Sequence, residues 1–425
     1  MEPRRAIPDV KFNGKNVSKR LQGYLKTLTY TDVAGGESDS ISISLQNIDT
    51  KWLNEWYPSK GDEISAGISF KNWEEENQDL YLECGDFILD DIKFSGGPMS
   101  ASFGALSIPV NEAFKATERT KTWKDVTIRQ MAEEISGRYS LELIYDADEI
   151  QISSVEQSEN TDSAFLYDIC KTYGLAMKVY RYKIIIFDKG KYEAKEPVDT
   201  IRRCDFVDDE WEYLDTLVGT YTGARISYTS GQDNEEISVY VGKIKEDAPG
   251  SRVLKVNEQA SDLSDAGYKA AAKVNESNES ATTISGRIFA KPKIVAGVTI
   301  SIEGLGKADG KYFVDKVTTE ISSGKTTMQM ELHKVQERIA YISQVVTDGS
   351  AAEEKKTYNV GDIVYFKGGT HYVSSYSDAI GYEVGPGTAK ITIANGSGQA
   401  HPWHLITENW SETHVYGWVD DGTFE

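Results

Sequence analysis

The sequence predicts a mainly β protein with an α+β insert and a small C-terminal barrel. Apolar and polar residues alternate up to about residue 107 and again from about 200 to 334, a period of two that is typical of strands. The residues between these blocks change to a helical period, and those after 357 return to short strands. We expect two β-barrels at 1–110 and 200–340, an α+β insert at 111–199, a linker at 341–357 and a barrel of SH3-like size at 358–425.

The first block contains three strand-like stretches. Ser40–Leu45 alternates Ser with Ile or Leu, Glu63–Phe70 alternates again, and Leu80–Phe94 is long enough for two strands. A short helical turn between the first two carries Trp52 and Trp56 on one face. We expect these tryptophans to anchor the core or an interface.

The insert is indicated by two amphipathic segments. Asp125–Tyr139 and Ser163–Tyr173 carry apolar residues at approximately helical spacing. Each is followed by strand-like residues, at 141–145 after the first and at 176–188 after the second. The insert is therefore an α+β domain of roughly eighty residues.

The second β block contains one helix, which we expect at about Ser261–Glu276 because Ser261 or Ser264 can cap it. Its small apolar residues suit packing against a sheet. Six strand-like stretches surround it: Asp215–Thr229, Ile237–Val241, Thr282–Phe289, Val298–Glu303, Lys311–Ile321 and Thr326–Leu332.

A short motif occurs in both β blocks. Residues 85–92 read Gly-Asp-Phe-Ile-Leu-Asp-Asp-Ile and residues 310–317 read Gly-Lys-Tyr-Phe-Val-Asp-Lys-Val, with a Gly, an aromatic, an Asp and a β-branched residue at the same offsets. A duplicated barrel would let three chains present six similar surfaces, as a joint between a threefold and a sixfold object requires. The alternative is chance similarity, because Gly followed by alternating apolar residues is common at strand starts.

Composition favours protein partners. The 425 residues are 39% hydrophobic and carry a formal charge of -21, which argues against capture of nucleic acid phosphates or anionic lipid. The three cysteines are too widely spaced for a disulfide scaffold. The longest apolar run, Ile184–Phe187, is too short to span a membrane. We expect no sequence-specific nucleic acid binding, no membrane span, and synthesis in the cytoplasm without Sec export.

The search for chemistry favours a protein that is not an enzyme. Four of the five histidines, His371, His401, His404 and His414, lie in the last module, but no cysteine or carboxylate pattern completes a zinc site. No acid pair of the lysozyme type and no Cys/His pair can be identified. We expect no catalytic residue, no metal and no cofactor.

Several motifs carry a family resemblance over about residues 1–340. The chain resembles the late control D family of bacteriophage tail hub proteins in Asp49–Pro58, Gly85–Asp90, Thr122–Ile128, Gln157–Leu166 and Asp309–Val314. The resemblance implies a structural baseplate hub of a contractile phage tail or an R-type bacteriocin. Its two tail-tube-like β-barrels would build a homotrimer that adapts the sixfold tail tube to the threefold spike.

The resemblance also implies partners and a location. The partners are other copies of the chain, the tail tube protein, the spike protein and other baseplate proteins. The protein would assemble in the bacterial cytoplasm and then form part of a released extracellular particle.

The C-terminal module resembles the SH3-like domains of tail proteins and cell-wall lysins of Gram-positive bacteria and their phages. The likeness rests on Tyr358–Asp362, Gly368–Tyr372, Ala400–Leu405 and Gly417–Asp420. The alternative function is a cell-wall-binding tail protein, accessory to a muralytic enzyme, that contacts cell-wall glycan. Trp403 and Trp418 could stack on glycan; the alternative interpretation is that they fill the core of the small barrel. The candidate ligand or interface aromatics are Trp52, Trp56, Tyr372, Trp403 and Trp418.

Overall fold

The computed structural model describes residues 3–107, 112–229, 236–322, 324–340, 358–394 and 400–424. Contacts divide the chain into two compact units, 1–347 and 348–425, which we call the body and the C-terminal module. The expected linker at 341–357 lies outside the described residues. The prediction of a mainly β protein with an α+β insert is confirmed.

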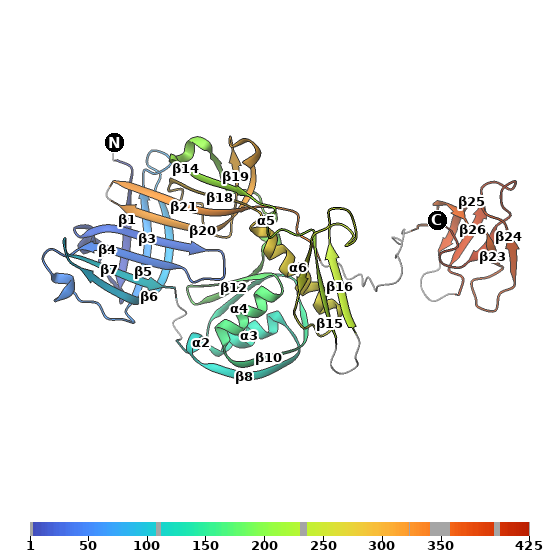
Figure 1. Ribbon diagram of the computed structural model, residues 1–425, viewed down its shortest axis with the longest axis horizontal. Helices are drawn as coiled ribbons and strands as arrows, with labels where there is room; N and C mark the ends of the chain where they lie inside the picture. Colours follow the sequence, from blue (N-terminus) through green and yellow to red (C-terminus); the bar gives the residue numbers. More distant parts are fainter. Residues whose placement is uncertain are drawn as a thin grey trace. The chain divides into compact units, whose positions relative to one another are not determined.

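The N-terminal strands of the body run side by side in the order β3-β4-β7-β6-β5-β1-β2. Figure 1 shows them in blue. A short helix, α1 (Ser18–Gln22), and a 3-10 turn, η1 (Lys51–Leu53), lie between strands. The strands are β1 (Arg5–Phe12), β2 (Lys15–Asn16), β3 (Leu25–Val33), β4 (Ser40–Gln46), β5 (Glu63–Lys71), β6 (Leu80–Ser95) and β7 (Ser100–Leu106).

Six later strands continue the same sheet. They follow the order β14-β18-β21-β20, with β19 on β20 and β13 on β19, and β20 pairs antiparallel with β3. Orange and blue strands therefore lie side by side in Figure 1, and one apolar core spans both sets. The strands are β13 (Thr200–Arg202), β14 (Phe206–Asp215), β18 (Thr282–Phe289), β19 (Thr299–Glu303), β20 (Gly310–Ser322) and β21 (Lys325–Lys334).

The insert has its own core. Both predicted helices exist, and each begins after a threonine, Thr127 or Thr161, whose hydroxyl accepts a hydrogen bond from the first turn. The first helix therefore starts three residues later than expected. The helices are α2 (Glu112–Ala116), α3 (Ile128–Arg138), α4 (Asp162–Thr172) and α5 (Lys189–Ala194). The strands are β8 (Glu118–Thr127) with β10 (Gln151–Thr161), and β9 (Glu142–Asp146) with β11 (Leu175–Tyr180) and β12 (Lys183–Asp188).

Part of the second β block forms a separate sheet. The sequence places 215–241 in the second barrel, but β15 (Gly223–Thr229), β16 (Glu236–Gly242) and β17 (Val253–Val256) pair only with one another among the described residues. The helix α6 (Leu263–Glu279) contacts this sheet, as Figure 1 shows. The chain leaves the large sheet at Asp215 and returns at Thr282.

The C-terminal module is one six-stranded sheet around a small core. Its order is β22-β25-β26-β27-β23-β24, and Phe366, Ile391 and Leu405 are fully buried. The strands are β22 (Ile363–Phe366), β23 (Gly369–Tyr372), β24 (Gly381–Val384), β25 (Gly387–Ala394), β26 (Trp403–Thr407) and β27 (Tyr416–Val419). Among the described residues, no helix has the length and hydropathy needed to cross a membrane.

Candidate functional site

The body contains one strand arrangement twice. The first repeat, β3-β4-β7-β6-β5-β1, and the second repeat, β14-β18-β21-β20-β19-β13, have the same strand order, and equivalent strands follow each other in the same sequence order. The repeats also differ in places. The segment from β15 to α6 is inserted between β14 and β18, and β13 is parallel to β19 whereas β1 is antiparallel to β5.

The sequence motif occupies equivalent strands in the two repeats. Gly85 lies in β6 and Gly310 begins β20. Five residues later, Asp90 and Asp315 are skipped in the pairing with β7 and β21, because the register shifts between residues 89 and 91 and between 314 and 316. A bulge of this kind re-aims a strand at one position. The motif therefore marks a local structure that both repeats share.

A glycine before β5 and β19 also has the same role in both repeats. Gly61 has φ 89° and Gly297 has φ 90°, a conformation that side chains with a Cβ disfavour. The N–H of Gly61 donates to Leu89 O at 2.9 Å, and the N–H of Gly297 donates to Val314 O at 2.8 Å. Leu89 and Val314 are both four residues after the motif glycine.

The correspondence between the repeats also includes β3 and β14. It is traced by starting at Leu89 or Val314 and stepping from each residue to its partner on the next strand of the sheet. Tyr30 and Tyr213 are equivalent, and each is followed two residues later by an aspartate, Asp32 or Asp215. Sequence reasoning missed this second motif, whose only signal is a repeated Tyr-x-Asp. The paired residues are Leu89, Ala105, Ile41 and Tyr30 in the first repeat, and Val314, Leu332, Ile284 and Tyr213 in the second.

The two repeats meet at an internal seam, the pairing of β3 with β20. The seam runs from Lys316 opposite Val33 to Ser322 opposite Thr27. Trp73 of the first repeat reaches the second, because its Nε1 donates to Ala290 O at 2.6 Å. The repeats are therefore joined through backbone pairing and not only through side chains.

A buried ion cluster fixes the insert to this seam. Lys178 in β11 binds Asp32 in β3 and lies 3.1 Å from Asp39 Oδ2. Asp32 also accepts from the N–H of Ala296 at 2.8 Å. Burial raises the pKa of Asp39 to about 6, and the Lys178 ammonium opposes that rise. Asp32 thus connects the insert with both repeats.

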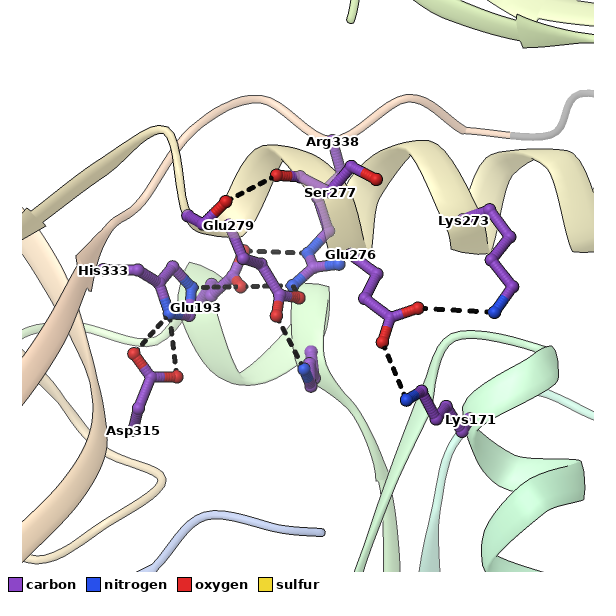
Figure 2. Close-up of polar contacts among 11 residues, drawn as sticks. Lys171, Glu193, Lys273, Glu276, Ser277, Glu279, Asp315, His333 and Arg338 are labelled. Carbon is purple, nitrogen blue, oxygen red and sulfur yellow. Dashed lines mark hydrogen bonds and ion pairs between the residues drawn. The ribbon is translucent and has the colours of Figure 1, made fainter. Parts of the chain in front are cut away.

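A second cluster joins the insert to the end of β21, as Figure 2 shows. His333 Nδ1 lies 2.8 Å from Asp315 Oδ2, and its Nε2 lies 3.0 Å from Glu193 Oε1 of α5. Arg338 binds Glu193 and lies 2.8 Å from Glu279 at the end of α6. Since each imidazole nitrogen faces a carboxylate, both donate and the ring is protonated.

The pKa values agree with this geometry. Burial alone would lower the pKa of His333, but the hydrogen bonds to Asp315 and Glu193 raise it to about 9. Burial alone would raise the pKa of Glu193, but the hydrogen bonds from His333 and Arg338 lower it to about 2. The charges of this cluster are paired with one another, so its role is structural: it holds the insert against the end of β21.

Comparison with solved structures identifies a known fold over about three quarters of this chain. The 43 kDa tail protein of prophage MuSo2 from Shewanella oneidensis superposes with a TM-score of 0.56 at 11% identity, covering 77% of this chain and 98% of that chain. A tail protein from Neisseria meningitidis MC58 gives 0.57 at 11% identity, covering 77% and 96%. This chain has the fold of these two tail proteins.

A third solved structure is less similar, and the two sequence comparisons found no match. Prophage tail protein gp18 from Listeria monocytogenes gives a TM-score of 0.48 at 10% identity, covering 72% of this chain and 87% of that chain. No protein-family model and no curated protein matches the sequence.

Two of the candidate aromatics lie in the first repeat. Trp52 is 7% exposed in η1, and its ring contacts Phe103 with centroids 5.6 Å apart. Trp56 is partly buried and lies 5.3 Å from the ring of Trp52. Both pack against the core of the large sheet, and neither is close in sequence to the duplicated motifs.

The other three candidates lie in the C-terminal module. The ring of Tyr372 stacks on His401 at 3.5 Å. Trp403 packs against Tyr358 and Phe424 and donates to Asp421 at 3.1 Å. Trp418 lies opposite His404 in the sheet, with ring centroids 5.2 Å apart.

Sequence reasoning missed the exposed aromatics of this module. Tyr382 in β24 is 57% exposed and Tyr416 in β27 is 58% exposed. The ring of Tyr382 contacts His371, and the ring of Tyr416 contacts His404. Their signal was weak because isolated tyrosines are common in strands. No group of His, Cys, Asp or Glu in the described parts of the chain is arranged to hold a metal ion.

Proposed function

We propose that this protein is the structural hub of a phage tail or a phage-tail-like bacteriocin. Three copies form a ring in which six strand repeats meet the sixfold tail tube, while the threefold end receives the spike. The observation that carries the proposal is the duplication: both repeats have the same strand order, the same bulge and the same positive-φ glycine. The fold shared with two tail proteins supports it.

The hub acts by holding partners, not by turnover. Its polar clusters are paired internally and tie the insert to the repeats. The proposed partners are further copies of the chain, the tail tube protein, the spike protein and other baseplate proteins. In a contractile tail the ring transmits the load of sheath contraction to the spike. The protein assembles in the bacterial cytoplasm and leaves the cell within the particle.

Mass measurement tests the trimer. The full-length protein is studied by native mass spectrometry, alone and mixed with its proposed partner, the tail tube protein. The proposal requires three copies per complex in at least the mixture, because a partner that binds only the ring stabilises it. Monomers or dimers in both samples would contradict the proposal.

The exposed aromatics favour a second function, in which the C-terminal module contacts cell-wall glycan. Tyrosine rings offer an apolar face and a hydroxyl to a sugar. The full-length protein would then pellet with purified peptidoglycan, and Tyr382→Ala with Tyr416→Ala would abolish pelleting. The matched control is Tyr365→Ala, because Tyr365 is 48% exposed in β22 at the opposite end of the sheet. Equal pelleting of all variants would exclude this surface.

A further inference from the structure

Among the residues that the structure describes, two strand edges of the body have the same form as the internal seam but no partner strand. The seam joins β3 of the first repeat to the C-terminal half of β20 in the second. The equivalent strands are β14, which ends the large sheet, and β6, whose residues 91–95 pair with β7 alone in the described part of the chain. Within the described residues, neither edge is paired with a further strand.

Side chains along these two edges are more exposed than the equivalent side chains in the seam, as expected for a strand that has no neighbour on one side. In the seam Tyr30 is 4% exposed and Thr319 is 1% exposed. Their equivalents, Tyr213 and Phe94, are half-buried. Leu214, which follows Tyr213, is 50% exposed. Open edges with apolar side chains invite pairing with another chain.

We infer that β6 of one copy pairs antiparallel with β14 of the next copy, in the register of the internal seam. This inference rests on the proposed ring, and it specifies the strands and the register that close it. In a ring of six repeats, three joints lie within chains and three lie between chains, and a common geometry makes them equivalent. The predicted pairs are Asp91 with Thr216, Ile92 with Asp215, Lys93 with Leu214, Phe94 with Tyr213 and Ser95 with Glu212.

Side-chain chemistry fits this register. In an antiparallel pair, Lys93 lies diagonally opposite Glu212 on the same face, so their charges attract. Phe94 lies opposite Tyr213 on the other face, which creates an aromatic pair across the joint. A slip of one residue would turn each set of side chains to the wrong face.

The equivalence of Asp32 and Asp215 supplies a further contact. Asp32 accepts from the N–H of Ala296 across the seam at 2.8 Å. Ala296 precedes Gly297 as Lys60 precedes Gly61, so Asp215 would face the N–H of Lys60 in the next copy. Asp215 is exposed in the single chain, whereas Asp32 is 5% exposed.

Engineered disulfides test the register. Cys84 and Cys170 are buried and Cys204 is exposed, so all variants carry Cys204→Ser. Lys93→Cys combined with Leu214→Cys should give covalent dimers and trimers under mild oxidation, because directly opposed residues lie within disulfide range. The matched control is Lys93→Cys with Asp215→Cys, which the one-residue shift places on opposite faces.

Single variants show whether the joint is head-to-tail. Neither Lys93→Cys nor Leu214→Cys alone should cross-link, but a mixture of the two chains should give a covalent dimer. Native mass spectrometry of the Cys204→Ser parent, alone and with the tail tube protein, measures assembly separately.

The outcomes separate this inference from the proposed function. A trimeric parent with cross-linking only for the 93/214 pair supports both. A trimeric parent that fails to cross-link at 93/214, or cross-links equally at 93/215, overturns the register while the ring stands. A parent with no trimer in either sample overturns the ring and the joint together.

Discussion

Asp90 and Asp315 occupy the same extra position in two equivalent hairpins, five residues after Gly85 and Gly310. Their side chains have diverged, because Asp315 binds His333 whereas Asp90 is exposed. The backbone role was thus kept while one copy gained a contact that fixes the insert. This pattern is what duplication followed by separate use of the two repeats produces.

The two positive-φ glycines should respond alike to substitution. A Cβ at Gly61 or Gly297 meets no atom within 4 Å, so Gly61→Ala and Gly297→Ala should each lower the free energy of unfolding by about 1–2 kcal/mol through backbone strain alone. Gly23→Ala is the control, because Gly23 has φ -77° and equally open space. Urea denaturation of the full chain measures all three. A large difference between the first two would argue against equivalent roles.

His333 should make the body sensitive to alkaline pH. Its pKa rises from 6.5 to about 9 on folding, so its contribution to stability is complete below about pH 6.5 and is lost as the pH rises to about 9. The shift corresponds to about 3 kcal/mol. Urea midpoints at pH 6 and pH 9 should differ more for the natural chain than for His333→Gln. Parallel pH dependence of the two proteins would show that the imidazole is not charged in the fold.

Removing Lys178 should leave two buried carboxylates without their cation. The side chains of Asp32 and Asp39 are 7% and 0% exposed, so Lys178→Met should lower the free energy of unfolding by about 3–5 kcal/mol at pH 7.5. The loss should shrink at pH 5, where Asp39 is protonated.

Lys183→Met is the matched control for Lys178. Lys183 lies in the same small sheet, but its partner Glu142 is 59% exposed, so the change should be below about 1 kcal/mol. Equal destabilisation by both variants would show that burial of the cluster adds nothing.

Trp403 should stabilise the C-terminal module through packing. Trp403→Ala removes contacts with Tyr358 and Phe424 and the hydrogen bond to Asp421, so we expect a loss of about 2–4 kcal/mol. Trp410→Ala should change stability by less than about 0.5 kcal/mol, because Trp410 is 57% exposed. Thermal unfolding followed by tryptophan fluorescence measures both. An unchanged midpoint for Trp403→Ala would favour a ligand-binding role.

The sequence was sufficient to predict β4, β5, β6, the strands from β18 to β21, two helices of the insert and the recurring motif. The strands β8, β10 and β14 and the helices α2 and α5 were not predicted. Apolar spacing is a local property, so Asp125–Tyr139 and Ser163–Tyr173 could be recognised as helix-forming segments, although their caps, Thr127 and Thr161, were not identified. The motif at Gly85 and Gly310 was visible because the bulge demands similar residues in consecutive positions.

Other features could not be predicted because they depend on distant contacts. The strand at 223–229 alternates in the same way whichever sheet receives it, so its separate sheet was missed. Glu193, Glu279, His333 and Arg338 come together from separate elements, and each one alone reads as an ordinary surface residue. The Tyr-x-Asp correspondence needed the strand pairing before it could be noticed.

Electron cryomicroscopy of the full-length protein bound to its tail tube tests the central claim most directly. The duplication predicts three copies in a closed ring, with the two repeats of each chain at the same height and about 60° apart around the axis. Two repeats at different heights, or a ring in which only one repeat meets the tube, would contradict it.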